Sequence, residues 1–464
     1  MRQFALACEV ARAQHSLAHA ILLQARQPRG DTRQVFTESH ARRYARSGSV
    51  VADWRALAAR QGKLYRREPR QSHSKQRGRR METFRYTFFA QEIVFGQGTI
   101  AQVGELVERF NARRAMLFTT ARARSRGMIA PIEEALGERL AVTYERVQPH
   151  VPEAEVAETT ALAERYNVDA LIGLGGGSAV GIAKAVSIAL EEARTGGLAR
   201  VGVPTDQPLV PVFAIPTTYA GSEITPTYGV TRDVNGVATK VTVTDPKIAP
   251  KVVIYDPVLT LDLPPRVTGG TGINAIAHCI EALYSIKRNP LSSAAALAGL
   301  RAMSDSLLRC YTDGADIEAR TEMLSGAFLA GTALSNVAMA LHHGICHVIG
   351  GATGAAHGDA NSVMLPYVMR FNLDATAPEL AQAADAMGVV TSGADPVAAA
   401  NAATEAIADW IERMRLPRRL RELGVQEEQI PDLARMAFAS RTVHNNPKPI
   451  TDVAQLEELL RQAW

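Results

Sequence analysis

The chain has 464 residues, of which 47% are hydrophobic, 21% charged and 6% aromatic. This length suggests two or three domains, and the composition excludes a disordered, collagen-like or disulfide-rich chain. No apolar run approaches the roughly 18 residues that cross a bilayer. The four cysteines form no CxxC pair, which favours a reducing compartment. We therefore expect a cytoplasmic protein without a membrane partner.

Positive charge is concentrated at the N-terminus. Residues 1–80 carry 18 of the 51 Lys and Arg residues but only 5 of the 47 Asp and Glu residues, which leaves 33 basic and 42 acidic residues in the remainder. Three interpretations stay open: a disordered or non-native extension upstream of a start at Met81, an arm that binds nucleic acid, or an Arg-rich targeting peptide. We favour the first, expect no nucleic-acid partner, and begin the fold at residue 81.

Strand and helix patterns alternate through the first half of the body. The apolar and periodic runs predict strands at 84–95 (or a hairpin there), 115–119, 141–147, 169–174, 211–216, 239–244 and 252–255, and helices at 100–110, 128–140, 153–166 and 179–193. Such alternation indicates a parallel, doubly wound sheet. We therefore expect an α/β dinucleotide-binding domain over residues 81–260.

Two segments of this half carry ligand-binding signals. Gly175, Gly176, Gly177 and Ser178 stand between a predicted strand and a predicted helix, an order that places backbone N–H groups and a helix N-terminus against a phosphate. Thr217 and Thr218 follow the strand 211–216, where open α/β sheets bind ligands. A tight turn and an ordinary polar loop are the simpler alternatives. Lys184 and Lys240 could hold an anion or be solvated surface residues.

From residue 261 the strand signals end. Apolar residues recur at helical spacing to the C-terminus, with breaks expected near 289–290, 313–314, 350–351 and Pro417. This pattern predicts an all-α C-terminal domain over residues 261–464.

Histidines cluster in the helical half. Of the seven after Met81, five lie between residues 278 and 357, and His150 stands apart. The pairs Asn274/His278 and His343/His347 each share a helix face, because residues four apart are neighbours. With His357 they can converge on one metal or acid/base site. His342 lies on a different face of its helix, and we expect it to be structural or peripheral.

Several motifs together resemble a known family. They are Gly175–Ser178 with Ala183-Lys184, the segment 215–223 (IPTTYAGSE), Tyr255-Asp256-Pro257, the segment 272–278, and His343 to His347 followed by Ala356-His357-Gly358. In order and spacing the chain from residue 81 resembles the iron-containing alcohol dehydrogenase family, and within it the maleylacetate reductases. The resemblance implies an N-terminal dinucleotide-binding domain, a helical domain and an active site between them.

The departures from the general family pattern indicate the subfamily. Metal-dependent members carry an aspartate and three histidines, whose positions here are Asn274, His278, His343 and His357. An amide in place of the carboxylate is a poorer ligand for a divalent metal. Gly181 replaces the usual aspartate after the glycines, and Tyr219 is also typical of the maleylacetate reductases. The resemblance therefore implies NADH or NADPH as the cofactor and no bound metal.

The implied reaction is reduction of the carbon–carbon double bond of maleylacetate to 3-oxoadipate, in the catabolism of aromatic compounds. Hydride adds to the alkene, an enolate develops on the ketone oxygen, and a general acid protonates the other carbon. The resemblance makes His343, His347 and Tyr219 the candidate catalytic residues. Asn274, His278 and His357 would shape the substrate pocket. The candidate cofactor-binding residues are Gly175, Gly176, Gly177, Ser178, Thr217, Thr218 and Thr120.

Thr120 bears on cofactor choice. Many NAD-preferring members carry an aspartate near this position, where it repels a 2′-phosphate. Its absence, with Arg122 and Arg124 close by in the sequence, leads us to expect that NADPH is accepted alongside NADH.

Three other functions stay open. They are a metal-dependent NAD(P)-linked alcohol dehydrogenase of the same family, a lyase resembling dehydroquinate synthase, and nucleic-acid binding through residues 1–80. We expect a small dicarboxylate as the substrate and a homodimer as the assembly.

Overall fold

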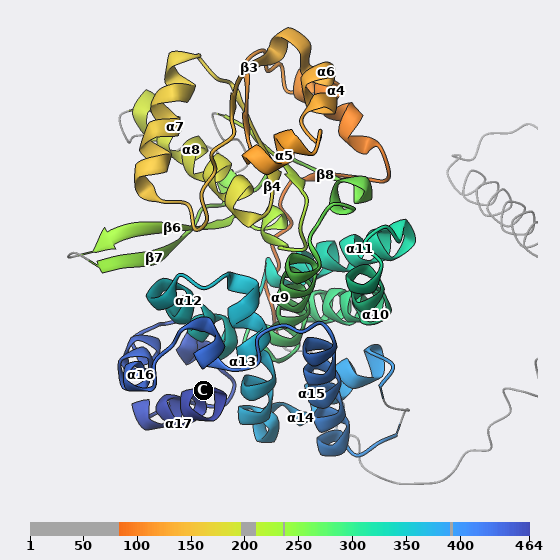
Figure 1. The fold of residues 1–464 in the computed structure, drawn as a ribbon, viewed down its shortest axis with the longest axis vertical. Coiled ribbons are helices and arrows are strands. Elements are labelled where there is room, and N and C mark those ends of the chain that lie inside the picture. The colour runs from red at the N-terminus through yellow and green to blue at the C-terminus, as the bar shows by residue number, and fades with distance from the viewer. Residues whose placement is uncertain (1–82, 196–209, 235–236, 390–392) are drawn as a thin grey trace, which may run out of the picture. The chain divides into compact units, whose positions relative to one another are not determined.

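The computed structural model of the protein describes residues 83–195, 210–234, 237–389 and 393–464. The basic extension expected at 1–80 lies outside the described residues. Figure 1 shows the arrangement of the helices and strands. Across the described part of the chain, no helix is long and apolar enough to cross a membrane.

A six-stranded parallel sheet forms the N-terminal half, in the order β1-β8-β5-β4-β2-β3. The strands are β1 (Glu92–Phe95), β2 (Ala115–Phe118), β3 (Leu140–Tyr144), β4 (Ala170–Gly175), β5 (Val212–Pro216) and β8 (Val252–Tyr255). Because β2 pairs with both β3 and β4, the strand order reverses between β2 and β4. In doubly wound sheets such a reversal is where ligands bind, beyond the carboxyl ends of the strands.

Helices cover both faces of this sheet (Figure 1). They are α4 (Val103–Arg109), α5 (Ala121–Ser125), α6 (Ala130–Leu136), α7 (Glu153–Arg165) and α8 (Gly177–Thr195). Successive side chains of a strand point to opposite faces, and β2 shows this directly. Leu117 packs with residues of α4 and α6, whereas Met116 and Phe118 pack with residues of α7 and α8.

Two strand predictions need correction. Of the strand or hairpin expected at 84–95, only Glu92–Phe95 is a strand. A strand that was not predicted, β6 (Thr227–Val234), pairs antiparallel with β7 (Val237–Thr244) in a separate two-stranded sheet. The sequence signal for β6 was that Tyr228 and Val230, two residues apart, are apolar. Both side chains are buried against the α7–α8 side of the core.

The C-terminal half is helical, so the predicted fold class is confirmed. Its helices are α9 (Pro265–Tyr284), α10 (Pro290–Thr312), α11 (Ile317–Leu334), α12 (Leu341–Thr353), α13 (His357–Phe371), α14 (Leu373–Ala386), α15 (Pro396–Arg413), α16 (Ile430–Phe438) and α17 (Val453–Ala463). The break expected at 350–351 is wrong. Helix α12 continues through both glycines and ends at Gly354, whose φ of +70° suits glycine. The domain boundaries stay predictions.

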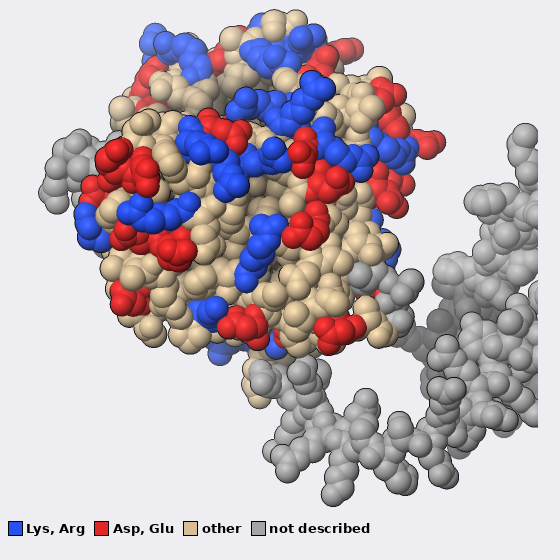
Figure 2. Space-filling model, turned by 60° about the horizontal axis from the view of Figure 1, so that its bottom comes forward, with Lys and Arg blue, Asp and Glu red and all other residues tan. Residues whose placement is uncertain are grey.

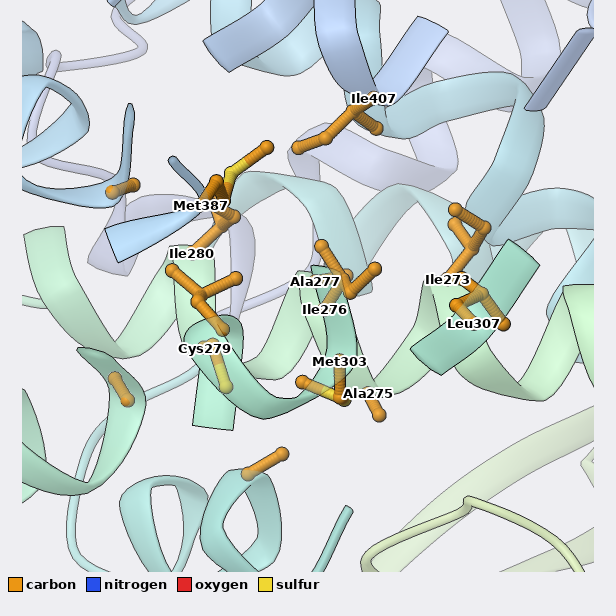
Figure 3. Close-up of a cluster of buried hydrophobic side chains, with 14 of the residues drawn as sticks. Ile273, Ala275, Ile276, Ala277, Cys279, Ile280, Met303, Leu307, Met387 and Ile407 are labelled. Atoms are coloured by element: carbon orange, nitrogen blue, oxygen red, sulfur yellow. The ribbon is translucent and has the colours of Figure 1, made fainter. Parts of the chain in front are cut away.

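Helix α9 is buried on nearly all sides. Figure 3 shows Ile273, Ile276 and Ile280 among apolar side chains of neighbouring helices, including Leu307 and Met387. Removing one such side chain typically costs about 2–5 kcal/mol. Within this apolar helix, one face is polar: Asn274, His278 and Glu281 stand at i, i+4 and i+7, which places them on one stripe.

The surface in Figure 2 intersperses positive and negative side chains. Several charged side chains of the helical half are paired, such as Arg370 with Glu405 at 2.9 Å and Arg418 with Glu412 at 2.8 Å. Exposed pairs of this kind contribute little to stability. The face shown in Figure 2 thus lacks the single-sign patch typical of a nucleic-acid interface.

Candidate active site

The predicted glycines and threonines come together at the carboxyl edge of the sheet. Gly175, with φ +147°, accepts a hydrogen bond from the backbone N–H of Thr217 at 2.9 Å. A Cβ on Gly176 would lie 3.3 Å from the Thr218 methyl group, and one on Gly173 would lie 2.7 Å from the carbonyl oxygen of Ala179. Glycine therefore lets α8 lie directly on β4, with its N-terminus at the strand end, as a phosphate site requires.

Thr120 lies on the other side of the strand reversal, as the exposed N-cap residue of α5. Arg122 donates from Nη2 to the backbone carbonyl of Asp262 at 3.1 Å. Arg124 pairs with two carboxylates, those of Glu133 at 2.8 Å and Glu145 at 2.7 Å. Both arginine side chains are thus bonded within the protein, and their effect on cofactor choice stays a prediction.

The loop 217–223 joins this edge to the helical half. The carbonyl oxygen of Ala220 accepts a hydrogen bond from Asn274 Nδ2 at 3.4 Å. Gly221 has φ +72°, and a Cβ there would lie 3.4 Å from His278 Nδ1 and 3.3 Å from Gly331 Cα. Both its backbone conformation and its close approach therefore require glycine. The loop 217–223 therefore contacts the glycine turn before α8 at one end and His278 of α9 at the other.

Lys184 tethers this loop and is not a surface residue. Its fully buried Nζ donates to the carbonyl oxygens of Ser222 at 2.7 Å, Thr225 at 2.7 Å and Thr227 at 3.0 Å. Burial lowers the pKa of Lys184 to about 7, and the nearby Glu223 opposes that shift. Because its three N–H groups face protein carbonyls, Lys184 orders the loop and does not face a ligand. The side chain of Lys240 lies outside the described residues.

We expect Lys184→Met to lower the free energy of unfolding by about 2–3 kcal/mol, since it leaves buried carbonyls without donors. The loop that it tethers should loosen, so KM for the cofactor should also rise. Lys247→Met is the matched control, because Lys247 is equally buried but pairs with Glu191 at 2.5 Å. Urea unfolding and steady-state kinetics would measure both effects. A cofactor KM that rises equally in both variants would contradict the assignment.

Tyr219 departs from its expected catalytic place. Its side chain is fully buried, and its hydroxyl accepts a hydrogen bond from Arg320 Nη1 at 3.0 Å. Burial raises the pKa of the phenol, and the neighbouring Cys310 adds to that shift, while Arg320 opposes it. A phenol held in this way anchors the loop in the core of the helical half. Sequence spacing could not show this, because Arg320 is 101 residues away.

The predicted histidines converge from three helices. The rings of His278 and His343 stack with centroids 4.7 Å apart, and the His357 ring lies 5.8 Å from that of His343. The His347 ring lies 6.3 Å from His343 and 5.6 Å from His357. These side chains come from α9, α12 and α13.

Two glycines allow the close approach of α9 and α13. A Cβ on Gly358 would lie 2.6 Å from the carbonyl carbon of Gly270, so the two helices touch backbone to backbone. This contact carries His357, the first residue of α13, next to the polar stripe of α9.

Glu281 is a site residue that the sequence analysis missed. It is fully buried, and its Oε2 lies 2.6 Å from Nδ1 of His343. Its Oε1 accepts the backbone N–H groups of Ala340 at 3.2 Å and His342 at 3.0 Å. The other ring nitrogen of His343, Nε2, lies 3.4 Å from Oδ1 of Asn274. Glu281 could have been predicted from the sequence, because it lies three residues after His278 and therefore on the same face of the helix.

His342 belongs to this cluster rather than lying at its periphery. It is fully buried, with Nδ1 3.3 Å from Nδ1 of His343 and Nε2 3.4 Å from the carbonyl oxygen of Asn361. Burial lowers the pKa of His342 to about 3, with His343 adding to the shift. Burial also holds the pKa of His278 well below its usual value.

The donor set fits a divalent metal. The ligand atoms of Glu281, His342 and His343 lie within 4.8 Å of one another. Within the described part of the chain, the buried Nδ1 of His278 has no hydrogen-bond partner, as expected of a nitrogen reserved for a ligand. Imidazole and carboxylate groups are the common protein ligands of zinc and iron.

A cavity of about 140 Å³ lies beside the cluster. His347 and His357 line it from the helical half, and His150 and Thr231 line it from the α/β half. The structure thus brings together His150, which stood apart in the sequence, and two of the predicted site residues.

Comparison with known proteins identifies the family. The family model described as iron-containing alcohol dehydrogenase matches residues 90–257, and the model for the C-terminal part of the iron-containing alcohol dehydrogenase family matches residues 268–464.

Named relatives extend over most of the chain. Maleylacetate reductase 1 of Cupriavidus pinatubonensis is 33% identical over 384 residues, which cover 83% of this chain and 98% of that protein. The NAD-dependent methanol dehydrogenase of Bacillus methanolicus is 34% identical over 372 residues, covering 78% and 96%. The crystal structure of maleylacetate reductase from Agrobacterium tumefaciens superposes with a TM-score of 0.69 at 34% identity, covering 83% of this chain and 99% of that one.

These matches contradict the expectation that no metal is bound. Both matching family models are described by their iron, and the buried group of Glu281, His342 and His343 could hold an ion. The loss of one carboxylate at Asn274 is offset by Glu281, two helical turns further along the same face of α9. The chain belongs to the iron-containing alcohol dehydrogenase family and is an oxidoreductase.

Proposed function

We propose that this NAD(P)H-dependent reductase acts on maleylacetate and reduces its carbon–carbon double bond to form 3-oxoadipate. One observation carries the proposal. The loop 217–223 contacts Gly176 through Thr218 and contacts Asn274 and His278 through Ala220 and Gly221. A dinucleotide whose phosphates bind at the N-terminus of α8 would therefore direct its nicotinamide toward the histidine cluster.

The cavity-lining histidines supply the proton chemistry in this proposal. Hydride adds to one alkene carbon, negative charge moves to the ketone oxygen, and the other carbon takes a proton. His347 lines the cavity and lies outside the inner group of Glu281, His342 and His343. We assign His347 as the proton donor. His343, fixed at Nδ1 by Glu281, presents Nε2 toward Asn274 and the reacting end of the pocket.

Of the buried group Glu281, His342 and His343, we assign His343 as a metal ligand and Glu281 as the carboxylate behind it. His278, His357 and, as an oxygen ligand, Asn274 would complete the set. Glu281 already accepts from His343 Nδ1, and a metal-binding histidine commonly donates its second N–H to a carboxylate in this way. When bound, the metal supplies a Lewis acid that polarises a carbonyl oxygen. The protein groups orient the substrate beside it and deliver the proton.

We expect purified protein to contain about one equivalent of iron or zinc, and His343→Ala to lose most of it. Chelation should lower the melting temperature, because a ligand at 100 times its Kd stabilises the folded state by about 2.7 kcal/mol. Elemental analysis and thermal unfolding would measure both effects independently of turnover. The exposed His444, which bonds the carbonyl of Phe438, offers the control His444→Ala. The assignment would be contradicted if the parent contained no metal and its melting temperature changed neither with chelator nor with added metal.

Cofactor choice gives a further prediction. We expect the protein to use NADPH as well as NADH, and Thr120→Asp to raise KM for NADPH at least about tenfold more than KM for NADH. The introduced carboxylate at the exposed end of β2 would repel a 2′-phosphate. Thr120→Asn has the same shape without the charge and should leave the ratio of the two KM values near that of the parent. An unchanged ratio in the aspartate variant would remove Thr120 from the cofactor site.

The decisive experiment follows NADH and NADPH oxidation with maleylacetate against a panel of aldehydes and alcohols. We expect a value of kcat/KM for maleylacetate at least about a hundredfold above that for any aldehyde. The second candidate function is a metal-dependent NAD(P)-linked alcohol dehydrogenase. The buried ligand group and the similarity to the methanol dehydrogenase favour it, and preference for an aldehyde or alcohol would establish it instead.

A further inference from the structure

The cavity beside the histidines has one wall that the proposed reaction does not use. His150 and Thr231 of the α/β half form this wall, and His347 and His357 of the helical half also line the cavity. His150 comes from the segment between β3 and α7, and Thr231 from β6. Figure 1 shows the β6–β7 hairpin next to α12, which carries His347.

The backbone at this wall is strained. His150 has φ +66° and the next residue, Val151, has φ +49°. Two consecutive non-glycine residues in the left-handed region are uncommon, and the second is β-branched, for which that region is especially unfavourable. Strain of this kind persists only where the surrounding structure imposes it, and it is concentrated at binding and catalytic sites.

Several contacts impose this conformation. The Thr231 hydroxyl donates to the carbonyl oxygen of His150 at 3.0 Å, and the Thr231 N–H donates to that of Val151 at 3.0 Å. Val151 is only 3% exposed, and a Cβ on Gly181 would lie 3.1 Å from its methyl group. The turn is therefore pinned between the hairpin and α8, and it holds the His150 side chain at the cavity.

The lining of the cavity is suited to an anion. The described residues that line it offer three imidazoles, one hydroxyl and the Cys346 thiol, and none of these described residues is a carboxylate. The N-terminus of α13 opens beside it at His357, and its N-cap residue, Ala356, makes no side-chain capping bond. N–H donors and a helix N-terminus together favour negative charge.

We propose that His150 binds a carboxylate of the substrate and so selects dicarboxylates over neutral carbonyl compounds. This inference rests on the proposed function, in which the substrate is a dianion. In that reaction the nicotinamide cofactor delivers hydride to one alkene carbon, and His347 donates a proton to the other. His150 lies on the wall that the α/β half contributes and holds the end of the molecule that does not react.

The kinetic test uses His150→Asn, since asparagine tolerates a positive φ but has a side chain too short to replace the imidazole. KM for maleylacetate should rise about tenfold or more, the scale of one lost charge-assisted hydrogen bond. Both kcat and KM for NADH should stay within about threefold of the parental values. Inhibition by fumarate, a small dicarboxylate, should weaken by a similar factor, whereas the control His444→Asn should change neither quantity.

A stability measurement separates binding from a structural role. His150→Gly relieves the positive φ, so its melting temperature should equal or exceed that of the parent while its affinity for fumarate falls. An unchanged KM and unchanged fumarate inhibition in both variants would overturn the proposal, as would a loss of kcat with KM intact. If the parent does not reduce maleylacetate, the proposed function fails, and the fumarate comparison still decides whether His150 binds carboxylates.

Discussion

Replacing His347 by Ala should lower kcat on maleylacetate about 10²-fold or more, the scale of losing a general acid. His343→Ala should produce a loss at least as large. KM for NADH should change little in either variant, because the cofactor phosphates are expected at the glycine turn before α8, whereas both histidines belong to α12 of the helical half. Steady-state kinetics with both substrates would measure the effects.

The two variants should differ in a second property. His343 stacks on His278 and contacts Glu281, so His343→Ala should also lose bound metal. His347 is half-buried at the cavity, so His347→Ala should keep its metal and lose the proton donor. Near-parental kcat in both variants would show that the cluster is structural and would place the active site elsewhere.

The second large effect is expected at Glu281. Glu281→Ala leaves the ring N–H of His343 and two backbone N–H groups without an acceptor, in a place that is fully buried. Each buried donor left without its acceptor typically costs about 1–3 kcal/mol. We expect a loss of this size in the free energy of unfolding, measured by urea denaturation.

Glu281→Gln is the informative partner variant, because it keeps the shape and one oxygen acceptor while removing the charge. It should fold with a smaller loss of stability and bind metal about 10–100-fold more weakly, as other losses of a carboxylate behind a metal-binding histidine do. An Ala variant as stable as the parent, with unchanged metal content, would show that the Glu281–His343 contact is unimportant.

The pH dependence of stability gives a related check. Burial acts to raise the pKa of Glu281, but His343 and the backbone N–H donors outweigh it and lower that pKa below its ordinary value. A carboxylate with a depressed folded-state pKa stabilises the fold above its unfolded pKa, and that contribution disappears as the pH falls through the folded pKa. As the pH falls below about 5, the free energy of unfolding of the parent should therefore decrease more than that of Glu281→Gln. Equal acid sensitivity in the two proteins would contradict this account.

Local patterns in the sequence were sufficient for much of the fold. The strand–glycine–helix segment around residues 170–195 and the buried strands of the sheet were predicted because hydrophobic periodicity and glycine placement act over a few residues. The spacings Asn274/His278 and His343/His347 predicted shared helix faces for the same reason. Family resemblance then connected these local features to an oxidoreductase.

Other features depended on contacts between distant segments. Arg320 holds the Tyr219 hydroxyl, Lys184 binds the loop after β5, and Thr231 pins the strained turn at His150. No local pattern specifies such partners, because each forms only when the chain has packed.

The same distinction applies to the histidine cluster. The sequence by itself determined which residues share each helix face, since helix geometry is local. Only the tertiary structure decided that Glu281 orients His343, that His342 belongs to the cluster, and that His150 joins the same cavity. The physical reason is that burial and interhelical distance decide which of several locally equivalent side chains meet, and both depend on the packing of the whole fold.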